Sequence, residues 1–254
     1  MPETNATRLE CCEVHGEYAS RFVAKTGQWT RCWSCVEAEL QALDARAQAD
    51  DAAQQGAARR EQRIAESGLE GRMLRATFSS YTAHRADQRE VLEACKTFAE
   101  SVDLESGRNL WLVGGVGTGK THLGAAMVTH FIHERDTSAA ILSAREIIRV
   151  LRATWGRNVA GDAETEIQVI DRLGRMGLLV LDEIGAGFSS DAERVQLFDV
   201  IDMRYKLGRP TVVLSNLTAK DMKPILGERT FDRLREGATL LTCSWPSHRV
   251  EAGQ

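Results

Sequence analysis

The chain has 254 residues, of which 43% are hydrophobic and 27% charged, proportions typical of a globular protein with room for one full α/β domain plus an appendage. A net charge of −4 provides no overall positive field, so contact with a nucleic acid would have to come from a local basic patch. The opening Met-Pro-Glu-Thr-Asn lacks the features of a signal peptide, and no apolar run approaches the ~20 residues that span a bilayer. We therefore expect a cytoplasmic protein without a membrane partner.

Four of the six cysteines lie within the first 35 residues, and in a reducing compartment such a cluster favours metal over disulfides. Cys12-x2-His15 and Cys32-x2-Cys35 are two paired-ligand motifs separated by 16 residues. Two such pairs can complete a closed, tetrahedral zinc site. Cys11 competes with Cys12 as the first ligand, and we favour Cys12 because both pairs then have the same spacing. The alternative is a set of unrelated thiols beside a surface histidine.

Residues 1–37 are therefore predicted to form a zinc-binding module. Between its ligand pairs, Glu17–Val23 and Gln28–Thr30 are expected to form a small hairpin around the turn at Thr26-Gly27. Such a module would be structural, because four protein ligands leave no coordination position for water.

Residues 38–70 are rich in good helix formers and poor in large apolar side chains. This composition predicts a helical linker that is either solvated or docked on another protein. Gly56 is a candidate break in that helix. The main domain is then expected to occupy residues 71–254.

The most specific motif in the chain is a glycine-rich loop, Gly114-Gly115-Val116-Gly117-Thr118-Gly119-Lys120-Thr121, which fits the G-x-x-x-x-G-K-[ST] pattern. A predicted buried strand, Asn109–Val113, precedes it, and a predicted helix, His122–His133, follows. In this setting backbone N–H groups and the helix N-terminus cradle phosphates. Lys120 would reach the β- and γ-phosphates and the Thr121 hydroxyl would hold magnesium. The motif therefore predicts ATP binding rather than a glycine-rich turn of no consequence.

A second motif predicts hydrolysis. Leu178–Asp182 is an apolar run that suits a strand buried on both faces of a parallel sheet. Asp182 and Glu183 at its carboxyl end would lie where open α/β sheets bind ligands. Asp182 can hold the magnesium shell, and Glu183 is placed to orient or deprotonate a water molecule. The alternative, a strand that happens to end in two solvated acids, weakens beside a phosphate loop.

Strands and helices alternate through the main domain. The predicted strands after the phosphate loop are Ala139–Ser143, Leu178–Asp182, Thr211–Ser215 and Thr239–Cys243. With Asn109–Val113 they predict a five-stranded, doubly wound parallel sheet of the α/β class. A helix from Gln88 to Val102 precedes them, and just before it Phe78 and Tyr81 either approach a nucleotide base or pack in the core.

Three further polar positions suit an ATPase. Asn216 follows a predicted strand and would reach the γ-phosphate, or else only cap the next helix. Arg229 and Arg233 are candidates for a finger that reaches a neighbouring subunit, and we favour Arg233. The alternative is that these arginines pair with acids on their own surface. Arg249 could add a positive charge within the same subunit.

From about Arg75 to Arg249 the order of these motifs resembles the DnaC-type helicase loaders, relatives of the DnaA initiators and the IstB transposase helpers. The most specific evidence is the pair of stretches Leu226–Leu234 and Trp245–Arg249. The resemblance implies a P-loop AAA+ ATPase domain without a large helical lid. It implies that Lys120 and Thr121 belong to the Walker A motif and that Asp182 and Glu183 form the Walker B motif. It further implies that Asn216 is sensor one, Arg233 the arginine finger and Arg249 sensor two.

The family also has an extra helix that helps to bind single-stranded DNA. Ala144–Trp155 fits it, with Arg145, Arg149 and Arg152 on one side. The loop Gly185–Arg194, with Phe188, is a further candidate for the strand-binding groove. Trp155 either stacks on a base or is buried under the loop adjacent to it.

Three functions are consistent with these features. The first is an ATP-dependent, phage- or prophage-type loader that places a hexameric replicative helicase on single-stranded DNA, with its N-terminal zinc module gripping the helicase. In this interpretation ATP also joins neighbouring copies of the chain. The second is an IstB-like helper of a DNA transposase. The third is a metal-stabilised adaptor whose nucleotide site is a switch without turnover.

Overall fold

The computed structural model describes residues 6–154, 164–184 and 191–248, apart from the side chain of Asp191. Predictions for Trp155, for Phe188 and its neighbours at 185–190, and for Arg249 lie outside this range. The chain divides into two compact units, one up to Arg59 and one from Arg60 onward. We describe each by itself.

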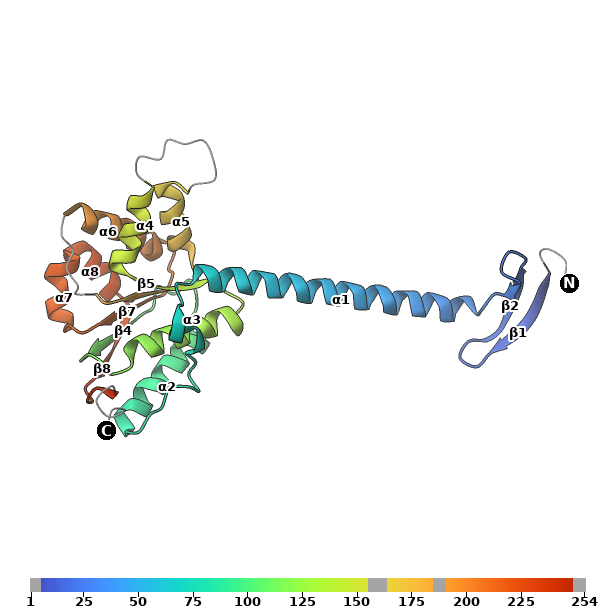
Figure 1. Ribbon diagram of the computed structural model, residues 1–254, viewed down its shortest axis with the longest axis horizontal. Coiled ribbons are helices and arrows are strands. Elements are labelled where there is room, and N and C mark those ends of the chain that lie inside the picture. Colours follow the sequence, from blue (N-terminus) through green and yellow to red (C-terminus); the bar gives the residue numbers. More distant parts are fainter. Residues whose placement is uncertain (1–5, 155–163, 185–190, 249–254) are drawn as a thin grey trace. The chain divides into compact units, whose positions relative to one another are not determined.

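The N-terminal unit contains a three-stranded antiparallel sheet of order β1-β2-β3 (Figure 1). Its strands are β1 (Thr7–Cys12), β2 (Gly16–Val23) and β3 (Gln28–Trp29). The predicted hairpin is confirmed as β2 and β3, joined through Gly27, whose φ of +69° favours glycine. The pairing of β1 with β2 was not predicted.

Helix α1 runs from Trp33 to Glu66. It is continuous through Gly56, so the suggested break is wrong; one glycine costs about 1 kcal/mol, which the many good helix formers around it offset. None of its 34 residues, all of which the structure describes, is buried. Neither α1 nor any other helix in the described ranges is both long enough and apolar enough to cross a membrane.

The second unit is built on a five-stranded parallel sheet of order β5-β6-β7-β4-β8. Its strands are β4 (Asn109–Gly114), β5 (Ala139–Ser143), β6 (Leu178–Asp182), β7 (Thr211–Ser215) and β8 (Ala238–Cys243). The five predicted strands are thus confirmed to within one residue at each end. The predicted doubly wound topology is confirmed as well, because β4 pairs with β7 and β8 rather than with β5.

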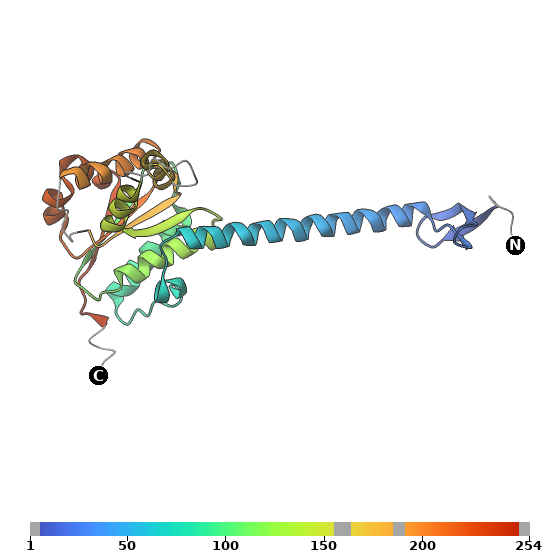
Figure 2. The same ribbon diagram turned by 45° about the horizontal axis from the view of Figure 1, so that its top comes forward.

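Helices cover both faces of this sheet (Figures 1 and 2). One face carries α2 (Ala86–Ser101) and α3 (Lys120–His133), together with the short 3₁₀ helix η1 (Gly71–Arg75). The other carries α4 (Ala144–Ala153), α5 (Glu166–Arg175), α6 (Asp191–Lys206), α7 (Ala219–Leu226) and α8 (Glu228–Arg235). Alternate strand residues serve the two cores: Leu110 and Leu112 face α2 and α3, whereas Trp111 and Val113 face the other layer.

One buried arginine fixes the second layer to the sheet. Arg204 of α6 is 1% exposed. It donates to the carbonyls of Leu173 at 2.7 Å, Met176 at 2.9 Å and Pro210 at 2.6 Å, and to Thr211 Oγ1 at 3.0 Å. Burial lowers the pKa of Arg204 to about 9. The guanidinium is therefore still charged at neutral pH, and its donors satisfy the end of α5 and the start of β7.

Candidate functional site

The phosphate loop joins β4 to α3, and its glycines are required by close backbone packing. Gly114, Gly117 and Gly119 have φ of +153°, +80° and +89°. A Cβ at Gly114 would lie 2.1 Å from the carbonyl oxygen of Cys243, and one at Gly117 would lie 1.9 Å from Ser247 Oγ. Side chains at these positions would push the loop away from the C-terminal segment. The glycines therefore set the shape of a loop that exposes its backbone to a ligand.

The Lys120 ammonium lies inside this loop. It donates to the carbonyls of Gly114 at 2.8 Å and Gly115 at 2.7 Å, and to Asn216 Oδ1 at 2.9 Å. Lys120 is only 7% exposed, and burial lowers its pKa. Asn216, at the end of β7, is thus brought directly to the loop; the helix that follows is capped instead by Thr218, which accepts from Asp221 N.

Both predicted acids, Asp182 and Glu183, line one cavity beside the phosphate loop. Asp182 ends β6, and its Oδ1 accepts from Glu183 N at 2.7 Å. Glu183 has a φ of +53°, uncommon for a residue with a side chain. The cavity has a volume of about 540 Å³ and is also lined by Lys120, Thr121 and Asn216. An ammonium, a hydroxyl, an amide and two carboxylates therefore line one cavity. Hydroxyl and carboxylate oxygens suit magnesium, and the ammonium suits a polyphosphate.

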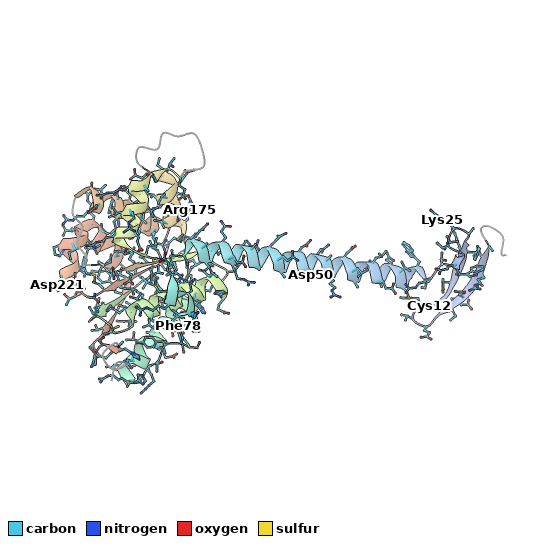
Figure 3. The ribbon with its side chains drawn as sticks, in the orientation of Figure 1. Cys12, Lys25, Asp50, Phe78, Arg175 and Asp221 are labelled. Atoms are coloured by element: carbon cyan, nitrogen blue, oxygen red, sulfur yellow. The ribbon has the colours of Figure 1, made fainter. Side chains whose placement is uncertain are left out.

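The C-terminal segment closes over the loop. Trp245 Nε1 donates to Thr118 O at 2.9 Å, and His248 N donates to Gly117 O at 3.0 Å. The Tyr81 hydroxyl donates to the same Thr118 carbonyl at 3.4 Å. A second cavity of about 170 Å³ lies among these residues. Of the two aromatic candidates for a base contact, Tyr81 lines this cavity and Phe78, labelled in Figure 3, does not, although both pack against the core cluster on the α3 side.

Two arginines of η1 also line the larger cavity, and the sequence motifs did not point to them. Arg72 and Arg75 lie beside the loop although they precede it by about 40 residues. The only sequence signal was their spacing of three, because residues i and i+3 share a face of a 3₁₀ helix. Nothing in that spacing indicates which surface η1 would reach.

Arg233 does not line the nucleotide cavity of its own chain. Its Nε lies 3.3 Å from Asp202 Oδ1, and its guanidinium lies 3.9 Å from the centroid of the Tyr205 ring. Arg233 instead lines a separate cavity of about 490 Å³, which Arg229, one turn earlier in α8, lines as well. The Arg229 side chain is exposed and has no ion pair or hydrogen-bond partner among the described residues.

Helix α4 has the amphipathic character expected of the extra helix. Ser143 caps it by accepting from Glu146 N at 3.2 Å, while Ile147 and Leu151 are fully buried. The three arginines of α4 are exposed, and Arg152 pairs with Glu193 of α6 at 2.9 Å.

The four predicted zinc ligands come together in the N-terminal unit, where Figure 3 marks Cys12. Cys12 and Cys35 Sγ are 3.4 Å apart, and His15 Nδ1 lies 3.7, 3.7 and 3.3 Å from the sulfurs of Cys12, Cys32 and Cys35. A tetrahedral zinc with ordinary bond lengths separates its ligands by about 3.4–3.8 Å. The cluster therefore fits zinc. Cys11 is exposed and outside the cluster, which favours Cys12 as the first ligand.

The pKa values of two thiols in this cluster, Cys12 and Cys35, are shifted in opposite directions. Backbone N–H groups of Val14 and His15 lower the pKa of Cys12 to about 6, whereas the hydrogen bond with Cys12 raises that of Cys35 to about 11. Neighbouring thiolates repel each other, so a second one forms readily only when a cation offsets the charge.

Comparison with known proteins gives two kinds of match. Residues 37–250 match the family described as IstB-like ATP binding protein. The replicative helicase loader DnaC of Buchnera aphidicola subsp. Schizaphis graminum is 33% identical over 188 residues, which cover 73% of this chain and 74% of the relative.

Solved structures show the same fold. A crystal structure of the DnaC helicase loader matches with a TM-score of 0.61 and 22% identity, over 68% of this chain and 99% of that one. AMPPCP-bound DnaA from Aquifex aeolicus matches with a TM-score of 0.57 and 19% identity, over 68% of this chain and 50% of that one. These two neighbours confirm the expected α/β fold with its five-stranded parallel sheet.

Proposed function

The chain belongs to the family of IstB-like ATP-binding proteins, and from this we propose that it is an ATP-dependent loader of a hexameric replicative helicase onto single-stranded DNA. The observation that carries the proposal is the convergence of Lys120, Asn216 and the two acids on one cavity. Relatives named as replicative helicase loaders, each about 30% identical over nearly three quarters of the chain, support the choice of cargo.

In this proposal the Walker A loop, residues 114–121, binds the phosphates of ATP. Thr121 and Asp182 hold Mg²⁺, which would neutralise charge on the phosphates. Lys120 exchanges its present carbonyl partners for phosphate oxygens, and Asn216 holds it in position. Glu183 accepts a proton from, or orients, the attacking water. The small cavity beside Tyr81 and Trp245 is the right place for the base, since it adjoins the loop.

We also propose self-association through the ATP site, and the position of Arg233 outside its own nucleotide cavity supports this. We propose Arg233 as the finger that reaches the γ-phosphate of a neighbouring subunit, with Arg249 acting within its own subunit. To do so, Arg233 must exchange Asp202 for phosphate. Arg233→Ala should lose turnover that mixing with Lys120→Ala protein partly restores, because each variant supplies what the other lacks. Arg229→Ala is the matched comparison; if it alone shows complementation, the finger is Arg229.

The N-terminal unit is proposed to hold the helicase. Cys12, His15, Cys32 and Cys35 would keep it folded around Zn²⁺. Exposed apolar side chains at the start of α1 offer a contact: Trp33, Leu40 and Leu43 are 68%, 51% and 62% exposed. Single-stranded DNA would contact α4, where Arg149 is exposed.

The test is reconstitution with the replicative helicase of the source cell. The chain should retain the helicase on an affinity column and, with ATP, transfer it to circular single-stranded DNA. Glu183→Gln protein should retain the helicase but release it slowly. Failure of the wild-type chain to retain the helicase would reject the loader.

A transposase helper is the second candidate, favoured by the description of the matching family. It predicts preferential binding to duplex DNA and retention of a transposase in place of the helicase. A nucleotide switch without turnover is the third, and it predicts no steady-state release of phosphate with or without DNA.

A further inference from the structure

The segment between α1 and α2 is fixed to the edge of the sheet. Ser67 is fully buried, and its carbonyl accepts from Ile141 N of the edge strand β5 at 2.8 Å. Gly68 has a φ of +71°, and a Cβ there would lie 2.3 Å from the Ile141 carbonyl oxygen. The Ser67 hydroxyl stabilises the local turn, because it accepts a hydrogen bond from Leu69 N at 3.1 Å. The start of η1 therefore has a defined position beside β5.

From this anchor, η1 carries Arg72 and Arg75 to the nucleotide cavity. Both are exposed, and among the described residues neither guanidinium has an ion pair or hydrogen bond. Their separation of three residues places them on one face of the 3₁₀ helix. Two adjacent, unpaired guanidinium groups that share a cavity with a phosphate loop are suited to bind phosphate oxygens, since each offers a planar fork of donors.

The charges of the cavity support this role. Asp182 and Glu183 repel a polyphosphate, and within the described ranges Lys120 is the only cation of the predicted motifs that lines this cavity. Lys120 already donates to the protein at distances of 2.7–2.9 Å to three acceptors. With Arg72 and Arg75 included, the charged side chains that line the cavity have a net positive charge. We propose that Arg72 and Arg75 bind the polyphosphate of the nucleotide held by the same chain. This inference rests on the proposed ATP site.

One consequence concerns α1. The last turn of α1 is tied to the ATPase core by an ion pair between Arg63 and Asp136, and Ser67 follows directly. Nucleotide bound by η1 would therefore stabilise residues 67–76. Amide hydrogen exchange of this segment should slow when ATP is added.

The test is titration with a fluorescent ATP analogue in the presence of magnesium. Arg72→Gln/Arg75→Gln should weaken ATP binding by about tenfold or more, the size expected for lost hydrogen bonds to charged groups. Arg72→Lys/Arg75→Lys keeps both charges but loses the planar forks of donors, so its affinity should fall between those of wild type and the glutamine pair, about threefold below wild type. Lys96→Gln/Arg175→Gln is the control: it removes two charges from exposed ion pairs elsewhere in the unit. Thermal melts check that each variant is folded.

Each result decides the matter. Unchanged affinity in the glutamine pair, or an equal loss in the control, would overturn the inference, as would unchanged exchange at residues 67–76 on adding ATP. If the glutamine pair does not fold, an unchanged affinity in the lysine pair, or unchanged exchange at residues 67–76, would overturn the inference. Saturable binding by wild type that Lys120→Ala abolishes and the glutamine pair retains would overturn only this inference. Absence of binding by wild type would overturn the proposed ATP site with it.

Discussion

The two candidate sites differ in what holds them together. The nucleotide cavity lies at the carboxyl ends of β4, β6 and β7, in a sheet with a large core on each face, so packing of the sheet positions its loop and acids. In the N-terminal unit, by contrast, only Ser20 and Cys32 are buried among residues 6–32. The sheet β1–β3 is too small to hold itself together by burial. Substitution of a site residue should therefore reduce activity but leave the fold intact at the nucleotide cavity, whereas substitution of a proposed zinc ligand should unfold the N-terminal sheet.

The largest effect is expected from zinc removal. Chelation, or Cys12→Ala, should unfold β1–β3, because structural zinc contributes ~10 kcal/mol or more to such domains. Elemental analysis should find about one zinc per chain, and NMR should show collapse of the N-terminal signals while those of the ATPase unit persist. Cys11→Ala is the matched control and should change neither. A zinc-free chain with intact N-terminal signals would break the comparison.

The next effect is on turnover alone. Glu183→Gln removes a carboxylate that is exposed at the mouth of the cavity. Because general-base groups contribute about 10²–10⁴-fold, phosphate release should fall by at least about a hundredfold. ATP affinity and the unfolding midpoint should stay close to wild type. Undiminished turnover would remove Glu183 from its proposed role.

A smaller effect, on stability alone, is expected from Arg204. Arg204→Met would leave buried carbonyls at the end of α5 and before β7 without donors, at a cost of about 2–3 kcal/mol. Urea unfolding of the ATPase unit should report the loss. Arg175→Met is the control, since it breaks an exposed pair worth about 0–1 kcal/mol. Equal midpoints for both variants would contradict the assigned role of Arg204.

The sequence predicted those features that depend on local pattern. Short, mainly apolar segments located the five strands of the parallel sheet, and ligand spacing located the cluster of three cysteines and a histidine, because both patterns are local properties of the sequence. Features set by distant contacts were not predictable. Arg204 looks like any basic residue near a helix end, yet carbonyls from two separate segments, 173–176 and Pro210, surround it.

Placement of η1 shows the same limit. Arg72 and Arg75 reach the nucleotide cavity only because Gly68 lets the chain pack on β5, about 70 residues later. Strand β1 was missed because none of its residues is buried, so it has no alternating apolar pattern to reveal it.

The account depends most directly on whether this chain takes up ATP. A fluorescent ATP analogue, titrated with magnesium into the full-length protein and into Lys120→Ala, measures this. We predict saturable binding by the wild type and at least about a tenfold weaker affinity in the variant, because its ammonium lies within the loop. Binding that does not saturate, or that is unchanged in Lys120→Ala, would contradict the account.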